Sequence, residues 1–226
     1  MTLSTLIESL RDAGVIKSER IFKVMMHVDR GKYVPQGLPP YADCPQPIGD
    51  GQTISAPHMH AQALELLGPF LKSGSHALDI GCGSGYLTSC MGRLVAPTGT
   101  VIGIENRESL VDLSRRNITE ADGDLLSAKT VDVRLGNAWT GEGFLPEDQQ
   151  EEMFDAIHVG AAADKMPDIL IGALKRPGRM VIPLGPQWGS QVFVVVDKDK
   201  DGGISQRELL SVMYVPLENR VRPRGQ

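Results

Sequence analysis

The segment from Ala77 to Tyr86 constrains the fold of this chain more than any other stretch, and it reads ALDIGCGSGY. A short apolar run ends in three glycines at alternate positions, and apolar residues at helical spacing follow it. Glycine adopts a positive φ and lets a ligand approach the backbone closely, and the start of a helix offers unpaired N–H groups. The segment predicts a strand, a tight turn and a helix that together bind a ligand with a nucleoside or amino-acid head.

The spacing of the glycines narrows the kind of ligand. Dinucleotide-binding turns follow the pattern G-x-G-x-x-G, whereas here Gly85 comes one residue early and Tyr86 takes the remaining position. Asp79 precedes the first glycine by two residues, and its carboxylate would repel a pyrophosphate and attract an ammonium group. The turn therefore resembles the first motif of the class I S-adenosylmethionine methyltransferase superfamily, whose cofactor carries an amino-acid tail.

Strand and helix patterns alternate from residue 75 onward, which is typical of an α/β fold with an open, doubly wound, mostly parallel sheet. We expect five parallel strands, a C-terminal antiparallel hairpin and an N-terminal helical cap. The expected parallel strands are 76–80, 100–104, 131–135, 154–159 and 179–183, the hairpin strands are 191–196 and 208–215, and the helices are 3–13, 18–29, 57–67, 85–95, 107–121 and 167–175.

The chain has 226 residues, a length that suits a single domain. Within that domain we expect four parts in order along the chain. They are the helical cap with a Pro- and Gly-rich substrate loop (1–56), the cofactor-binding core (57–190), the terminal hairpin (191–217) and a flexible tail (218–226).

Composition and charge exclude several classes of protein. The net charge is −5 and the isoelectric point is near 5.5, so we expect no nucleic-acid partner. The sequence contains no apolar run of about 18 residues, the length that predicts a membrane span. The first residues do not resemble a signal peptide. Cys44, Cys82 and Cys90 are odd in number and lack metal-ligand spacing, which favours free thiols in the cytoplasm. We expect a cytoplasmic monomer.

Two polar residues stand at the ends of neighbouring expected strands. Glu105 follows Gly85 by 20 residues, and an acid at this position can accept both hydroxyls of a ribose; the alternative is a solvated acid at a strand end. Asn137 follows the third strand, where it could bond an adenine edge or simply stabilise a turn. Because parallel strands end at one edge of a sheet, both residues can converge on the glycine turn.

A second stretch, residues 51–61, makes the resemblance more specific. It reads GQTISAPHMHA, and LDIGCGSGY, VIGIE, FDAIHVGAAA, GRMVIPLGP and YVPL follow in that order. This series resembles the protein-L-isoaspartate (D-aspartate) O-methyltransferase family over residues 33–217. His58 and His60 also invite a metal site, but they straddle a helix start and point in different directions. We expect no metal.

The resemblance implies an enzyme that transfers a methyl group from S-adenosyl-L-methionine, with S-adenosyl-L-homocysteine as product. The acceptor would be the free carboxylate of L-isoaspartyl or D-aspartyl residues in damaged peptides and proteins, which are then repaired through a succinimide. Ser55 would be the catalytic residue, as a hydrogen-bond positioner of that carboxylate. The implied substrate residues are Thr53, Ile54 and Ser55, and the implied cofactor residues are His60, Asp79, Gly81, Cys82, Gly83, Gly85, Glu105, Asn137 and Ala138.

Other functions remain as alternatives to this interpretation. The acceptor could be a different small molecule or protein. Residues 197–208 match the pattern of an EF-hand calcium loop, but strand-like sequence flanks them, so we expect an acidic hairpin turn. A nicotinamide reductase would need glycine at Tyr86. Methylation of nucleic-acid bases is disfavoured because no Asn/Asp-Pro-Pro-aromatic motif follows the fourth strand.

Overall fold

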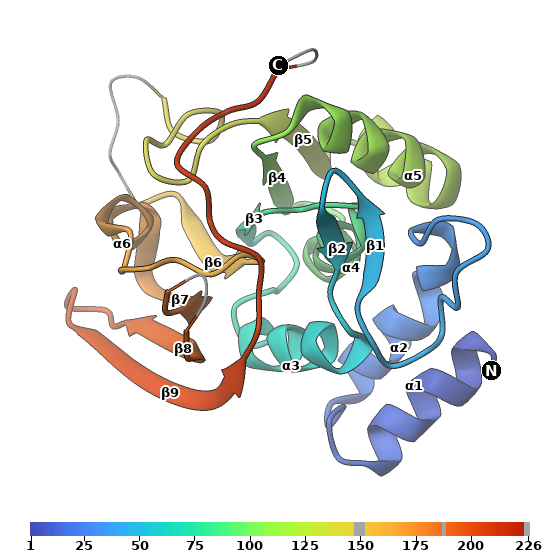
Figure 1. The fold of residues 1–226 in the computed structure, drawn as a ribbon. Helices are drawn as coiled ribbons and strands as arrows, with labels where there is room; N and C mark the ends of the chain where they lie inside the picture. The colour runs from blue at the N-terminus through green and yellow to red at the C-terminus, as the bar shows by residue number, and fades with distance from the viewer. Residues whose placement is uncertain (147–151, 187–188, 224–226) are drawn as a thin grey trace.

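A seven-stranded sheet forms the centre of the computed structural model, which describes residues 1–146, 152–186 and 189–223 (Figure 1). The strand order is β5-β4-β3-β6-β7-β8-β9. The first five strands in this order are parallel and the last two are antiparallel. The strands are β3 (His76–Ile80), β4 (Thr100–Glu105), β5 (Val131–Leu135), β6 (Phe154–Val159), β7 (Leu174–Leu184), β8 (Gln191–Lys198) and β9 (Ile204–Val212). The predicted doubly wound sheet is confirmed.

The central strands are apolar because both faces of the sheet are covered. Successive side chains of a strand point to opposite faces, and Ala77 of β3 packs in one hydrophobic cluster while Leu78 and Ile80 pack in the other. The first cluster contains α3 (Pro57–Leu67), α4 (Tyr86–Val95) and α5 (Glu108–Ser127), and the second contains α6 (Asp168–Ala173). Strands buried on both sides give the continuous apolar runs that made them predictable.

The N-terminal cap contains the two expected helices, α1 (Leu3–Asp12) and α2 (Glu19–His27). The side chain of Ser18 accepts a hydrogen bond from the N–H of Ile21 and so caps α2. A 3₁₀ helix, η1 (Arg30–Lys32), follows. The cap continues into an antiparallel ribbon of β1 (Gln46–Gly49) and β2 (Gln52–Ile54). The sequence did not predict this ribbon, because its strands are too short to show a period of two.

The largest differences from the predicted ranges are at β7, α5 and β9. Strand β7 begins at Leu174 and not at residue 179, so it includes the last residues of the predicted helix 167–175. Helix α5 continues past residue 121 to Ser127 across a kink at Asp122, whose carboxylate accepts a hydrogen bond of 2.6 Å from the buried Tyr33 hydroxyl. Strand β9 covers residues 204–212 and not 208–215, so the chain leaves the sheet at Met213. The segment after β9 then crosses the carboxyl edge of the sheet (Figure 1).

The segment that resembles an EF-hand loop is the turn between β8 and β9, as expected. One carboxylate oxygen of Asp199 accepts hydrogen bonds of 2.8 Å from the N–H groups of Asp201 and Gly203. Asp197 forms an ion pair with Arg179. Strands flank this turn in place of the two helices of an EF-hand.

No helix in the described part of the chain is long and apolar enough to cross a membrane.

Replacing Gly85 by alanine tests how tightly the glycine turn is packed. Gly85 has a φ of +88°, and an added Cβ would lie 2.5 Å from Ser114 Oγ and 3.0 Å from Ile118. Gly37 has a φ of +86° with nothing within 4 Å of an added Cβ, so Gly37→Ala is the matched control. We expect Gly37→Ala to lower the free energy of unfolding by about 1–2 kcal/mol, and Gly85→Ala to lower it by roughly 1–3 kcal/mol more. Urea unfolding of the ligand-free protein measures both values, and equal losses would contradict the packing argument.

Candidate active site

The glycine turn leaves β3 at the carboxyl edge of the sheet with the backbone that the sequence predicts. Gly81, Gly83 and Gly85 all have positive φ, at 72°, 54° and 88°. The N–H of Gly81 donates to the Ile104 carbonyl at 2.8 Å, which ties the turn to the end of β4. A side chain at Gly83 would approach Ile48 to 3.1 Å. The turn therefore needs glycine both for its conformation and for its contact with the β1–β2 ribbon.

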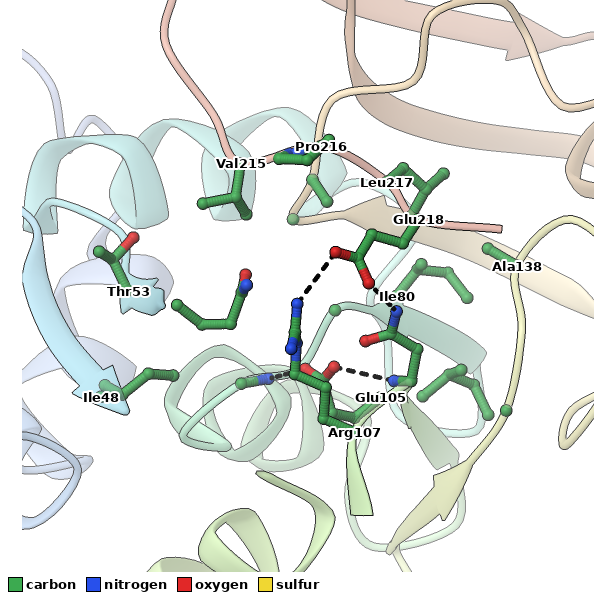
Figure 2. Close-up of a pocket in the computed structure, with 18 residues that line it drawn as sticks. Ile48, Thr53, Ile80, Glu105, Arg107, Ala138, Val215, Pro216, Leu217 and Glu218 are labelled. Atoms are coloured by element: carbon green, nitrogen blue, oxygen red, sulfur yellow. Dashed lines mark hydrogen bonds and ion pairs between the residues drawn. The ribbon is translucent and has the colours of Figure 1, made fainter. Parts of the chain in front are cut away.

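Three cavities meet beside this turn. We call the first the strand-edge cavity, because the ends of β3, β4 and β5 line it together with the β1–β2 ribbon and residues 215–218 (Figure 2). The Asp79 cavity lies between β3, the start of α4 and residues 53–60. The Tyr214 cavity lies between residues 53–59 and residues 210–215. Thr53 and Gly160 border all three cavities, so the cavities lie next to one another.

Glu105 lies in the strand-edge cavity and is almost fully buried. Its two carboxylate oxygens accept hydrogen bonds from the N–H groups of Asn106, at 2.8 Å, and Gly83, at 3.1 Å. Burial raises the pKa of this carboxyl group, and the backbone N–H donors oppose that rise. The prediction that Glu105 and the glycine turn converge is thus met by a direct hydrogen bond.

Asp79 is 1% exposed and borders the cavity named after it. Its carboxylate accepts a hydrogen bond of 2.6 Å from the Thr88 hydroxyl and one of 2.8 Å from Nδ1 of His158. A carboxylate only accepts, so His158 carries its proton on Nδ1. Asp79 and His158 stand opposite each other in the parallel pairing of β3 with β6. The two partners hold Asp79 in place at the cavity wall.

His60 is buried on α3 and lines the Asp79 cavity. The charge of the imidazole is disfavoured first by burial and then by the nearby Arg30, so the pKa of His60 lies well below 6.5. Arg30 is fully buried, and burial lowers its pKa to about 10. His60 does not converge with His58, whose Nδ1 lies 2.9 Å from Asp43. The two histidines point to different partners, as their positions at the helix start predicted.

Ser55 borders both the Asp79 cavity and the Tyr214 cavity. Its carbonyl accepts a hydrogen bond of 2.8 Å from Arg30, and its side chain is a hydrogen-bond partner of Tyr214. Burial raises the pKa of Tyr214 to about 12, while the bond to Ser55 acts in the opposite direction. Ile54 and Cys82 line the Asp79 cavity as well. The residues around Ser55 are thus brought together as the sequence predicts.

Asn137 and Ala138 have different positions at the end of β5. Ala138 lines the strand-edge cavity, whereas Asn137 is not among the lining residues. The Asn137 side chain accepts from the N–H of Trp139 at 2.9 Å and donates to Asn219 at 3.1 Å. These contacts are those of a turn asparagine, the alternative that the sequence left open.

Residues 215–222 form a strap across the strand-edge cavity. The carboxylate of Glu218 lies 3.0 Å from Arg107 (Figure 2). It also lies 2.8 Å from Arg222, and the Leu217 carbonyl accepts from Trp139 at 3.0 Å. The sequence predicts a flexible tail from residue 218, but Glu218 instead lines the cavity. Residues 224–226 of that tail lie outside the described residues.

Sequence reasoning did not assign Arg30, His158 or Tyr214 to the site. His158 is the last residue but one of the fourth predicted strand, and Tyr214 begins the YVPL string, so the position of each carried a usable signal. Arg30 lies in no recognisable motif. Only its tertiary contacts show its place behind Ser55 and His60.

An open parallel sheet with a glycine turn after one strand and an acid at the end of the next has the architecture of a class I methyltransferase. The family model for protein-L-isoaspartate(D-aspartate) O-methyltransferase matches residues 1–222. The chain belongs to this family.

Individual relatives agree with this assignment. A protein-L-isoaspartate O-methyltransferase of Triticum aestivum is 45% identical over 96% of this chain and 91% of its own length. One of Caenorhabditis elegans is 43% identical over 97% and 93%. A Plasmodium falciparum protein of this family, solved in complex with S-adenosyl-L-homocysteine, superposes with a TM-score of 0.87 at 37% identity, covering 96% of this chain and 99% of that one.

The buried, neutral His60 makes stability depend on pH. Its folded pKa lies below the 6.5 of an unperturbed histidine, so below pH 6.5 the unfolded chain binds a proton that the folded chain excludes. We expect His60 to lower the free energy of unfolding by about 1.4 kcal/mol for each pH unit below 6.5. His60→Gln should remove this part of the slope. Urea unfolding between pH 7 and pH 5 measures it, with the exposed His27→Gln as control; an unchanged slope in His60→Gln would contradict the burial argument.

Proposed function

We propose that this chain transfers the methyl group of S-adenosyl-L-methionine to the free carboxylate of L-isoaspartyl or D-aspartyl residues in damaged peptides and proteins. The observation that carries the proposal is the meeting of the three cavities at Thr53 and Gly160. The family membership supports the same reaction. The strand-edge and Asp79 cavities would hold the cofactor, and the Tyr214 cavity would hold the peptide.

The buried charges of the site fit the polar groups of this cofactor. Glu105 would accept the ribose hydroxyls, and Asp79 would accept the ammonium group of the amino-acid tail. Gly81 and Gly83 both line the strand-edge and Asp79 cavities. A glycine backbone lets a ligand approach closely because no Cβ stands in the way. Ala138 leaves room at the end of β5 for the adenine. The bound cofactor supplies a methyl group already activated by a positively charged sulfur.

The chain needs to position the acceptor and not to activate it. A carboxylate is ionised at pH 7 and is itself the nucleophile, so no general base is required. Holding the two reacting groups in line contributes roughly 7–11 kcal/mol. Ser55 would hold the acceptor carboxylate through its hydroxyl, at the border between the peptide and cofactor cavities. Residues 215–218 cover the strand-edge cavity and would exclude water.

The lining of the Tyr214 cavity suits recognition of a damaged linkage. Pro45, Ala56, Met59, Val212 and Val215 make it largely apolar. Among the residues that the structure describes, no acidic, lysine or arginine side chain lines it, so charged residues beside the damaged site would have no such partner there. The resulting methyl ester closes to a succinimide, and hydrolysis of the succinimide regenerates some normal aspartate.

We propose a monomer acting in the cytoplasm on isoaspartyl-containing peptides and proteins. Cys44, Cys82 and Cys90 are free thiols, which supports a reducing compartment.

Matched peptides that differ only in L-isoaspartate or L-aspartate at one position test the proposed acceptor. We expect label from methyl-labelled cofactor only in the isoaspartyl peptide. Ser55→Ala should lower kcat/KM for this peptide about 10- to 100-fold, the effect of one hydrogen bond to a charged group, and leave the affinity for S-adenosyl-L-homocysteine unchanged. Ser205→Ala is the control, because Ser205 is exposed on β9 and lines none of the three cavities. Labelling of neither peptide by an enzyme that binds the cofactor would point to another acceptor.

Glu105→Gln tests the assignment of the strand-edge cavity to the ribose. The substitution keeps the size of the side chain but replaces one acceptor oxygen by a donor. We expect the affinity for S-adenosyl-L-homocysteine, measured by calorimetry, to fall about 10- to 100-fold. Asp132→Asn, which changes an exposed acid on β5 that is paired with Arg134, should have no effect. Unchanged affinity in Glu105→Gln would show that the ribose lies elsewhere.

A further inference from the structure

Arg30 is the most unusual charged residue near the site. It is fully buried, and its three hydrogen-bond partners contain no carboxylate. Nε donates to the Pro40 carbonyl at 3.0 Å, Nη2 to the Ser55 carbonyl at 2.8 Å, and Nη1 faces Nδ1 of His60 at 3.2 Å. Burying a cation without a negative partner is costly. The fold therefore retains a positive charge behind two residues that line the Asp79 cavity.

The contact between Arg30 and His60 defines where the imidazole carries its proton. Arginine has only N–H donors and no acceptor, so Nδ1 of His60 must accept. A neutral imidazole that accepts at Nδ1 carries its proton on Nε2. Among the described residues, Nε2 has no hydrogen-bond partner, and His60 lines the Asp79 cavity. The Nε2–H group is thus available to a ligand in the Asp79 cavity.

The walls of the Asp79 cavity therefore favour ligand groups of opposite charge. Asp79 supplies a buried negative charge, and His60 supplies an N–H donor backed by the Arg30 guanidinium. Arg30 also lies 5.6 Å from the ring centre of Tyr86, another lining residue. An amino acid in its zwitterionic form carries an ammonium and a carboxylate on one carbon atom. The amino-acid tail of the cofactor fits these walls, with its ammonium toward Asp79 and its carboxylate toward His60.

We propose that Arg30 is a positioning residue, which fixes His60 as the Nε2–H tautomer so that His60 donates to the carboxylate of the cofactor's amino-acid tail. The same guanidinium donates a hydrogen bond to the Ser55 carbonyl and so fixes the position of Ser55 relative to His60. The inference rests on the proposed placement of the cofactor but not on the identity of the methyl acceptor. A merely structural Arg30 would stabilise the protein without any preference for the tail of the ligand.

The protonation of His60 in the ligand-free protein is the first test. In the ¹⁵N long-range spectrum of the histidine-labelled wild-type protein at pH 7, we expect His60 to give the pattern of a neutral Nε2–H ring. A ring protonated at Nδ1, or at both nitrogens, would overturn the proposal. This measurement needs no variant, so it tests the His60 tautomer that the proposal requires even if substitutions of Arg30 do not fold.

Two ligands separate the positioning role from a structural one. S-adenosyl-L-homocysteine carries the amino-acid tail, and methylthioadenosine has the same nucleoside and sulfur without it. We expect Arg30→Met to weaken S-adenosyl-L-homocysteine about tenfold or more in calorimetry, and to change the affinity for methylthioadenosine less than twofold. Arg30→Lys, which can reach only some of the three partners, should lie between Arg30→Met and wild type. Equal weakening of both ligands would overturn the proposal.

Tyr33→Phe is the matched control. Tyr33 lies three residues after Arg30 and is similarly buried; its hydroxyl donates to Asp122 and accepts from the hydroxyl of Ser89, away from His60. The variant should be less stable but should retain the His60 spectrum and both affinities. If Tyr33→Phe shifted the affinity ratio of the two ligands as Arg30→Met does, the shift would come from disturbing residues 30–33 in general, and the proposal would fail. Because no peptide enters these measurements, absence of isoaspartyl methylation would refute the proposed acceptor without touching this result.

Discussion

The parallel pairing of β3 with both of its neighbours is the constraint on which the rest of the structure depends. Asp79 stands opposite Gly103 of β4 on one side and opposite His158 of β6 on the other. This register determines where the chain leaves the sheet and brings the turn within hydrogen-bond distance of Glu105. A slip of one residue would turn every β3 side chain to the opposite face, so the hydrophobic clusters that bury Ala77 and Leu78 also keep Asp79 at the cavity.

Three buried charged residues of the site are stabilised mainly by dipoles. The partners of Asp79 are a hydroxyl and an imidazole, those of Glu105 are backbone N–H groups, and those of Arg30 are two carbonyls and an imidazole. Arg107 and Glu218, by contrast, form an ion pair at the strap. Glu105 and Arg30 therefore do not have to leave an ion-pair partner when a ligand that carries both signs of charge enters.

Much of this could be predicted from the sequence, for a physical reason. Strands buried on both faces must be apolar throughout, and a helix must bury a stripe, so β3 to β7 and the major helices leave a local pattern. Local sequence patterns also predicted the glycine turn and the position of Glu105 beside it. The contacts of Arg30 depend on carbonyls and rings supplied by residues 40, 55 and 60, and the kink at Asp122 is accommodated by Tyr33, 89 positions away. No local pattern records such contacts.

The strap formed by residues 215–222 links cofactor binding to the stability of the segment that follows the sheet. Residues 215–218 supply one wall of the strand-edge cavity, and Glu218 anchors the strap through Arg107 and Arg222. A ligand in this cavity would contact the strap as well as the strand ends. Its binding free energy would therefore also oppose local opening of the strap.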